Sequence, residues 1–373
     1  MRNPTAVGRR TARALACLAA AAAAGCGGDD RSDGSTAAAT SATTTSAPQQ
    51  FADVKAYLLQ HTGPLTRQTA ALSDEADRYY ALVRGERFDY EALLREHRDE
   101  VRDLVTSMQA TWRKVNPLYE QAEGVIAGVP ELADYDVILD AGAPAADDPE
   151  NAVPFDLKRP DGKVEKRPGN FFFLTETALW GTERKFTATG VRPDLDGDGN
   201  ISYGEALPDA NHLVAAARDF ARNARDLDAS AQKWTPNASD VFTALVVMTP
   251  TMSEYFGAWK NSRFVAGSDA KEASFVGTSR LSDITDILSG LERVYAGVRP
   301  LVARVSGAQA DQTGQSLTRL RAFAANLRDR EADGERFTAE QADALGSEAQ
   351  ERAEAIAGQV SQAAAKLDVE VEH

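Results

Sequence analysis

Apolar residues recur at steps of three and four along much of the chain after residue 51, which is the period of an α-helix. One stripe lies between residues 93 and 115, and another between residues 281 and 298. Their members are Leu93, His97, Val101, Leu104, Val105, Met108, Trp112 and Val115, and Leu281, Ile284, Ile287, Leu288, Leu291, Val294, Tyr295 and Val298. Each stripe predicts one amphipathic helix that packs its apolar face against other helices.

Two further stripes follow the same period nearer the C-terminus. They consist of Leu317, Leu320, Phe323 and Leu327, and of Leu345, Ala349, Ala353, Ile356, Val360 and Leu367. Convincing alternating runs of the kind that form β-strands are not found. The pattern predicts an all-α fold of bundled helices, and the 373 residues allow either one large bundle or two smaller packed ones.

A change of composition divides the helical pattern. Residues 141–170 are rich in proline, glycine and charged side chains, which predicts an irregular connection. It separates an N-terminal helical part at residues 51–140 from a C-terminal helical part at residues 171–373. Connections of this length are often functional or mobile.

The start of the chain predicts export. Basic residues precede an apolar run from Ala14 to Ala24, and small residues stand directly before Cys26. This arrangement resembles a bacterial lipobox, so we expect residues 1–25 to be a signal peptide and Cys26 to carry lipid. The protein would then be anchored to the cell membrane on its extracytoplasmic face. Ordinary signal cleavage that leaves Cys26 unmodified is the alternative.

Composition, charge and cysteine usage limit the kinds of protein that the chain can be. Residues 26–50 contain almost no large apolar side chain and predict a flexible tether. The net charge of −15 disfavours nucleic acid as a partner and suits cations. Cys17 lies in the predicted signal peptide, so the mature chain has neither an internal disulfide nor a cysteine metal site. No other apolar run is long enough to span a bilayer.

The stretch DLDGDGNISYGE at residues 194–205 matches the twelve-residue calcium loop of an EF-hand. Calcium prefers six to eight oxygen ligands, which closely spaced carboxylates supply. The expected ligands are Asp194, Asp196, Asp198, Asn200, Ser202 and Glu205. Gly199 permits the sharp reversal of the chain, and Ile201 is expected to point inward.

An acidic, solvent-exposed turn is the alternative for this loop. Pro208 interrupts the helix that usually leaves such a loop, so we expect the next helix to restart there and the site to be weak. Residues 329–340, DREADGERFTAE, are the only candidate for a paired loop. Arg336 occupies a place that needs an apolar residue, and Thr338 with Gln341 forms a capping box, so this segment favours a helix–turn–helix instead.

A resemblance to a known family follows from three further segments. FLTETALWG at residues 173–181 resembles the signature of the imelysin family, in which a GxHxxE helix runs on to Leu-Trp-Gly. PLYEQAEGVIAGVPELADYDVILDAG at residues 117–142 resembles the YExxE segment of its iron-uptake branch, and residues 333–350 resemble a later helix–loop–helix. The resemblance implies an exported, often lipid-anchored, all-α protein associated with iron capture. Some members of the family were first described as peptidases.

The resemblance assigns roles to individual residues. It places the Glu of the family motif at Glu176, the His at Phe173, and the two acids of YExxE at Glu120 and Glu123. Phenylalanine cannot ligate a metal, so half of the motif is missing. Glu120, Glu123 and Glu176 would still form an oxygen-rich cluster suited to iron or calcium. The alternative is that Glu120 and Glu123 lie on solvated helix faces and Glu176 at a helix end.

The histidines do not indicate an enzyme. His97 lies on an apolar stripe, where a single histidine is more often a core residue than a ligand. His212 is expected at the start of a helix after the acidic loop, and His61 and His373 have polar or terminal surroundings. The sequence contains no HExxH motif and no evident Ser-His-Asp set, so we expect no enzymatic activity, and a peptidase in particular is disfavoured.

Two functions are consistent with these observations. The first is a lipid-anchored, calcium-binding protein of imelysin type that captures iron or assists its uptake, with a metal permease or another envelope protein as partner. The second is a non-enzymatic structural or interaction protein of the cell envelope, in which calcium stabilises the fold. They differ in whether iron binds.

Overall fold

A computed structural model describes residues 51–191 and 193–372 of the chain. The predicted signal peptide, the tether and the lipidation site Cys26 lie outside the described residues. The predicted all-α fold is confirmed, because the described elements are helices apart from one short hairpin, β1 (Leu157–Lys158) with β2 (Val164–Glu165). None of the described helices is long and apolar enough to cross a membrane.

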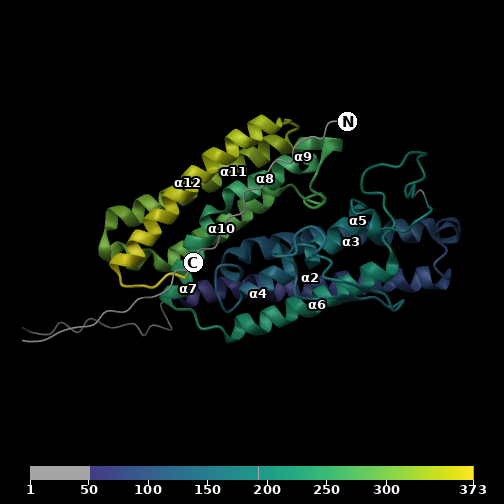
Figure 1. The fold of residues 1–373 in the computed structure, drawn as a ribbon, viewed down its shortest axis with the longest axis horizontal. Coiled ribbons are helices and arrows are strands. Elements are labelled where there is room, and N and C mark those ends of the chain that lie inside the picture. Colours follow the sequence, from purple (N-terminus) through teal and green to yellow (C-terminus); the bar gives the residue numbers. More distant parts are fainter. Residues whose placement is uncertain (1–50, 192, 373) are drawn as a thin grey trace, which may run out of the picture. The chain divides into compact units, whose positions relative to one another are not determined.

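Three long helices, two from residues 51–140 and one that follows the acidic loop, pack together. α2 (Ala52–Gly85) contacts both α3 (Tyr90–Ile126) and α6 (Ala210–Lys233), and the three lie side by side in the ribbon (Figure 1). The predicted stripe on α3 faces this core, since Leu93, Val101 and Trp112 are at most 2% exposed. Burial of these side chains supplies the main driving force for packing.

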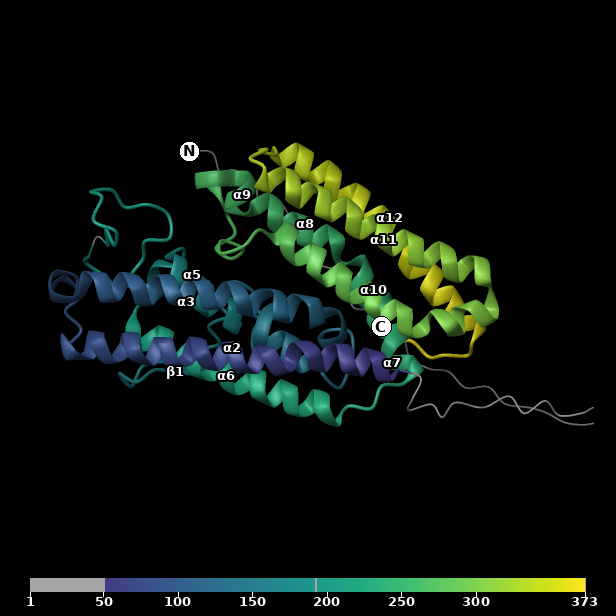
Figure 2. The same ribbon diagram turned by 180° about the vertical axis from the view of Figure 1, so that it is seen from behind.

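The C-terminal half contributes the remaining long helices. α10 (Arg280–Val305) contacts α3 and α11 (Gly307–Ala332), and α12 (Ala339–Lys366) contacts α11 and α8 (Met252–Asn261). Figure 2 shows these helices from behind. Each member of the predicted stripe on α10 is buried, and the apolar side chains of both halves form one continuous core.

Short elements connect the long helices. Those before α6 are α4 (Ala133–Asp136), the π-helical turn η1 (Val137–Ala141), α5 (Phe171–Trp180) and the 3-10 turn η2 (Arg184–Phe186). Those after α6 are α7 (Ala238–Met248), η3 (Thr249–Thr251), α9 (Arg263–Ala266) and η4 (Gly267–Asp269). α5 begins after Asn170, whose side chain accepts a hydrogen bond from the Phe173 amide.

Residues 329–340 form the predicted helix–turn–helix. α11 ends at Ala332, and α12 begins after Thr338 with the capping box that Thr338 and Gln341 form in both directions. Satisfying these backbone groups explains why the segment turns here rather than forming a second calcium loop.

Candidate metal centre

Glu120 and Glu123 lie one turn apart on α3, so both side chains point from the same face of the helix. They are 1% and 4% exposed, which excludes the alternative of a solvated helix face. That face packs against α10, and the two carboxylates therefore lie within the protein.

A third carboxylate comes from the π-helical turn η1. Leu139 is fully buried and anchors the turn, and the next residue is Asp140. Carboxylate oxygens of Glu120, Glu123 and Asp140 all lie within 4.8 Å of one another, and we call these residues the buried acidic cluster. Single π-helical turns are rare and often occur at functional sites.

One guanidinium faces this group from the start of α10. The Nη1 atom of Arg280 lies 3.4 Å from Glu120 Oε2 and 3.4 Å from Asp283 Oδ2. Rings of Tyr255 and Phe275 lie 4.4 Å from the same guanidinium and hold it in place. A single buried cation thus faces a larger number of carboxylates.

Hydrogen bonds satisfy only part of the cluster. Tyr255 donates its hydroxyl hydrogen to Glu123 Oε1 at 2.7 Å, and outside the cluster Tyr119 donates to Asp136 at 2.6 Å. The second oxygen of Glu123, Oε2, is buried without a hydrogen-bond partner among the described residues. An unpartnered buried carboxylate oxygen is costly unless a proton or a cation reaches it.

The electrostatics of the cluster favour protons or a cation. Burial raises the pKa of Glu123 to about 7, and repulsion from Asp140 adds to this effect while Arg280 opposes it. Burial and the nearby Asp283 raise the pKa of Glu120 well above its usual range. Burial also raises the pKa of Asp140, against the influence of Arg280. A hard cation bound to these oxygens would replace the protons.

Glu176 does not join this cluster. Its Oε2 accepts a hydrogen bond from the Phe275 amide, and its Oε1 accepts from the amides of Val276 and Gly277, at 2.8–2.9 Å. Burial raises the pKa of Glu176 to about 8, although these amides oppose the shift. Asp140 therefore occupies the place in the acidic cluster that was predicted for Glu176. The Glu176 carboxylate instead holds the segment that precedes α10.

Phe173, the position that the resemblance assigns to a histidine, packs among apolar and cationic neighbours. Its ring meets the edge of Phe186 at a centroid distance of 5.9 Å, and the Nζ atom of Lys185 lies 5.7 Å above it. The side chain is half-buried and contributes packing only.

The acidic loop at residues 194–205 brings three carboxylates together. Oxygens of Asp194, Asp196 and Asp198 lie within 4.8 Å of one another. Asp194 accepts hydrogen bonds from the amides of Gly197 and Gly199, and Gly199 adopts a φ of +89°, as predicted.

The remaining predicted ligands follow in the same loop. The Asn200 amide donates to Asp198 Oδ1, and the Ser202 amide donates to Glu205 Oε2. Glu205 Oε1 also accepts from the amides of Leu195 and Asp196. Glu205 therefore closes the loop through hydrogen bonds to its backbone.

The flanks of the loop differ from the prediction. Ile201 is 43% exposed rather than directed inward, and none of the described helices adjoins the loop. An antiparallel bridge between Thr187 and Pro208 closes its base instead. α6 begins at Ala210 with Asp209 as its N-cap, so Pro208 precedes the helix rather than starting it. The cap is favoured because Asp209 accepts two backbone hydrogen bonds there.

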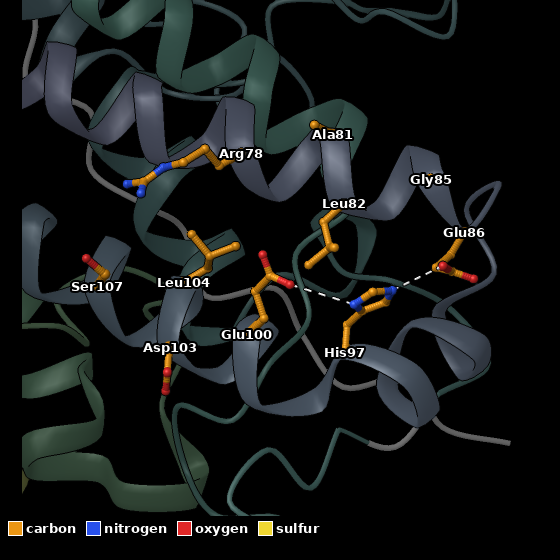
Figure 3. A pocket seen from close by; sticks show the side chains of 10 residues that line it. All are labelled: Arg78, Ala81, Leu82, Gly85, Glu86, His97, Glu100, Asp103, Leu104 and Ser107. Atoms are coloured by element: carbon orange, nitrogen blue, oxygen red, sulfur yellow. Dashed lines mark hydrogen bonds and ion pairs between the residues drawn. The ribbon is translucent and has the colours of Figure 1, made fainter.

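The histidines have partners of their own. His97 lies in an open groove of about 970 Å³ between α2 and α3, with Nε2 3.2 Å from Glu86 and Nδ1 3.7 Å from Glu100 (Figure 3). His97 is therefore a half-exposed groove residue and not a core residue. His212 is fully buried, with Nδ1 3.0 Å from Glu165. His61 lies 2.9 Å from Gln121.

Sequence reasoning missed Asp140, Arg280 and Asp283. Asp140 lies inside the segment that resembles the iron-uptake branch, but nothing in the helical period marks it, because a π-helical turn places it. Arg280 and Asp283 stand at the start of the α10 stripe and look like ordinary N-terminal charges in the sequence. Only the packing of α10 against α3 brings them to the cluster.

Comparison with known proteins gives one family. A family model described as Imelysin (Peptidase_M75) matches residues 59–363, which is most of the chain. No curated protein matches. The matched range includes the buried acidic cluster, the acidic loop and every long helix at least in part.

Proposed function

The chain belongs to the imelysin family, and on that premise we propose that it captures a hard metal cation, iron in the first place, and assists its uptake. The observation that carries the proposal is the buried Glu123 Oε2. This oxygen has no hydrogen-bond partner among the described residues, and it lies in the cluster with the carboxylates of Glu120 and Asp140. Carboxylate oxygens are ligands that hard cations prefer. Iron is the cargo in this proposal, and the protein supplies the oxygen ligands.

Capture at this cluster is coupled to protons. Burial raises the pKa of Glu123 to about 7 and raises the pKa values of Glu120 and Asp140, so the metal-free cluster holds protons more strongly than exposed acids do. A cation must displace these protons to bind. Acidification then weakens binding, which provides a way to release the metal.

Iron binding tests the proposal. Purified protein is dialysed against ferric nitrilotriacetate, which keeps Fe³⁺ in solution, and the iron bound per chain is measured. We expect Glu123→Gln to lower the affinity by about tenfold or more, since it removes a charged ligand. Glu176→Gln is the matched control, a buried glutamate outside the cluster, and should bind iron like the parent. No iron binding by the parent protein would refute the capture role.

Calcium binding at residues 194–205 is a second proposed property. The convergence of Asp194, Asp196 and Asp198 supports it. In this proposal calcium neutralises the acids and orders the loop. If calcium binds and iron does not, the second candidate function is favoured, in which the protein has a structural or interaction role in the cell envelope and calcium stabilises the fold.

The remaining parts of the proposal concern location and activity. We propose that the signal peptide and a lipid on Cys26 place the protein on the extracytoplasmic face of the cell membrane, where a permease or another envelope protein receives the metal. Mass spectrometry of the mature N-terminus tests the lipid. We assign no peptidase chemistry to the chain, and a metal-dependent cleavage of casein that Glu123→Gln abolishes would refute this assignment.

A further inference from the structure

A second pocket lies where α3, the end of α5, the acidic loop and the segment after α8 meet. Its volume is about 400 Å³, and its lining includes Arg102, Arg113, Trp180, Tyr203, Arg263 and Gly277. Pockets of about 300–1,000 Å³ are typical of sites for small molecules. Neither the proposed metal centre nor the calcium loop gives a role to the arginines that line this pocket.

Two of these arginines lie on aromatic rings and are not paired with acids. The guanidinium of Arg263 lies 3.3 Å from the ring centroid of Tyr203, and that of Arg113 lies 4.9 Å from Trp180. Within residues 51–191 and 193–372, neither forms an ion pair with a carboxylate. Arg102 differs, because Asp99 and Asp103 pair with it at 2.8 and 3.0 Å. Unpaired guanidinium groups are notable in a chain with a net charge of −15.

The acids in the same lining are engaged by the backbone. Glu205 accepts hydrogen bonds from the amides of Leu195, Asp196 and Ser202, and these hold its pKa below the usual range against the effect of burial. Asp196 accepts from the Asp198 amide. Both oxygens of Glu205 and Oδ1 of Asp196 thus accept from the loop backbone, while the terminal nitrogens of Arg113 and Arg263 have no hydrogen-bond partner among the described residues.

Hydrogen bonds fix the walls of the pocket before any ligand arrives. Gln109 donates from Nε2 to the carbonyls of Leu179 and Gly204, which ties the acidic loop to the end of α5. Arg113 donates from Nε to the Gly277 carbonyl at 3.0 Å, so its terminal nitrogens stay available. A side chain at Gly277 would collide with Trp180, because its Cβ would lie 2.8 Å from that ring. A preorganised site loses less entropy on binding.

We propose that this pocket binds a small organic acid. The forked guanidinium groups of Arg113 and Arg263 would hold the anionic head, which is a carboxylate or a phosphate. The ring of Trp180 and the side chains of Phe264 and Val276 offer an apolar surface to a planar body. The site is distinct from the proposed metal centre and does not depend on a bound metal.

Titration calorimetry with full-length protein in EDTA-containing buffer tests this site. The probes are 1-naphthoate and 1-naphthyl phosphate, whose relative affinities separate the two kinds of head, and neutral 1-naphthalenemethanol as the control for charge. We expect one site for at least one of the anions and at least about tenfold weaker binding of the neutral probe. Equal binding of the neutral probe, or no binding of either anion, would overturn the proposal.

Variants locate the site. Arg113→Gln with Arg263→Gln should weaken anion binding by about tenfold or more, and Arg102→Gln, the paired arginine in the same lining, should change it by less than about threefold. If the double variant unfolds, Arg263→Gln alone replaces it in the test, because the Arg263 side chain makes no hydrogen bond among the described residues. This single substitution should weaken anion binding by about threefold or more. Unchanged affinity in the folded variant would overturn the assignment.

Discussion

At the scale of single residues, Glu123 is a buried acid whose hydrogen bonds are incomplete. Its Oε1 accepts from Tyr255, whereas its Oε2 has no partner among the described residues. Such a group lowers the stability of the metal-free protein when it ionises. In the proposed function, the same oxygen is the one to which a cation would bind.

Glu123→Gln should make the metal-free protein less sensitive to pH. The folded-state pKa of Glu123, about 7, lies above the ordinary value of 4.5 for a glutamate, so the folded parent holds this proton to higher pH than the unfolded chain does. The contribution of Glu123 to stability is therefore present below about pH 4.5 and is lost as the pH rises through 7. Urea unfolding in EDTA at pH 5 and pH 8 should show the variant gaining up to about 3 kcal/mol on the parent at the higher pH. A difference that does not vary with pH would contradict this ionisation.

Glu176→Gln should loosen the segment before α10 without affecting iron. The parent carboxylate accepts from the amides of Phe275, Val276 and Gly277, and an amide side chain has only one acceptor oxygen. Hydrogen exchange of these amides should accelerate by about tenfold, which corresponds to the loss of about one hydrogen bond. Glu123→Gln is the control, with unchanged exchange there. Loss of iron binding in Glu176→Gln would instead return Glu176 to the metal centre.

At the scale of elements, the helical stripes were predictable and the metal centre was predictable in part. Repeated burial every three or four residues leaves a direct mark on the sequence, so the α10 stripe and most of the α3 stripe were predicted correctly, with the half-exposed His97 as an exception. Glu120 and Glu123 were found through the resemblance. Asp140 required the π-helical turn, and Arg280 required the packing of α10, and neither is a local property of the sequence.

The acidic loop, too, could be predicted from the sequence only in part. The spacing of the residues predicted that the acids converge and that Gly199 reverses the chain, and both features are present. The exposure of Ile201 was not predicted, because it depends on flanks without helices. The Thr187–Pro208 bridge holds the base of the loop and Gln109 holds Gly204, but no described helix flanks the loop on either side, so it is poorly braced for tight binding.

Calcium binding to this loop should accordingly be weak and should depend on Glu205. We expect one site with a dissociation constant of about 10⁻⁴–10⁻³ M by calorimetry. Glu205→Ala should abolish the heat of binding, since it removes the twelfth-position ligand. Asp333→Ala, in the helix–turn–helix at residues 329–340, is the control and should bind like the parent. No heat with several millimolar calcium would leave residues 194–205 as an acidic turn.

At the scale of the whole molecule, α3 connects the proposed sites. It carries Glu120 and Glu123 of the acidic cluster, and Gln109 and Arg113 of the arginine-lined pocket. The pocket in turn shares Asp196 and Glu205 with the acidic loop. The loop and the pocket are therefore adjacent, and charge placed in one acts on the other at short range.

Calcium and the organic acid should consequently strengthen each other's binding, if both proposals hold. A calcium ion in the loop would neutralise Asp196 and Glu205, which otherwise repel an anion held by Arg113 and Arg263. We expect 1-naphthoate to bind at least about threefold more tightly in 5 mM calcium than in EDTA, and by linkage naphthoate should raise the calcium affinity by the same factor. Both titrations are repeated with Glu205→Ala, in which the effect of calcium on naphthoate should vanish. Equal naphthoate affinities with and without bound calcium would show that the pocket does not sense the loop, while leaving each site to stand on its own titration.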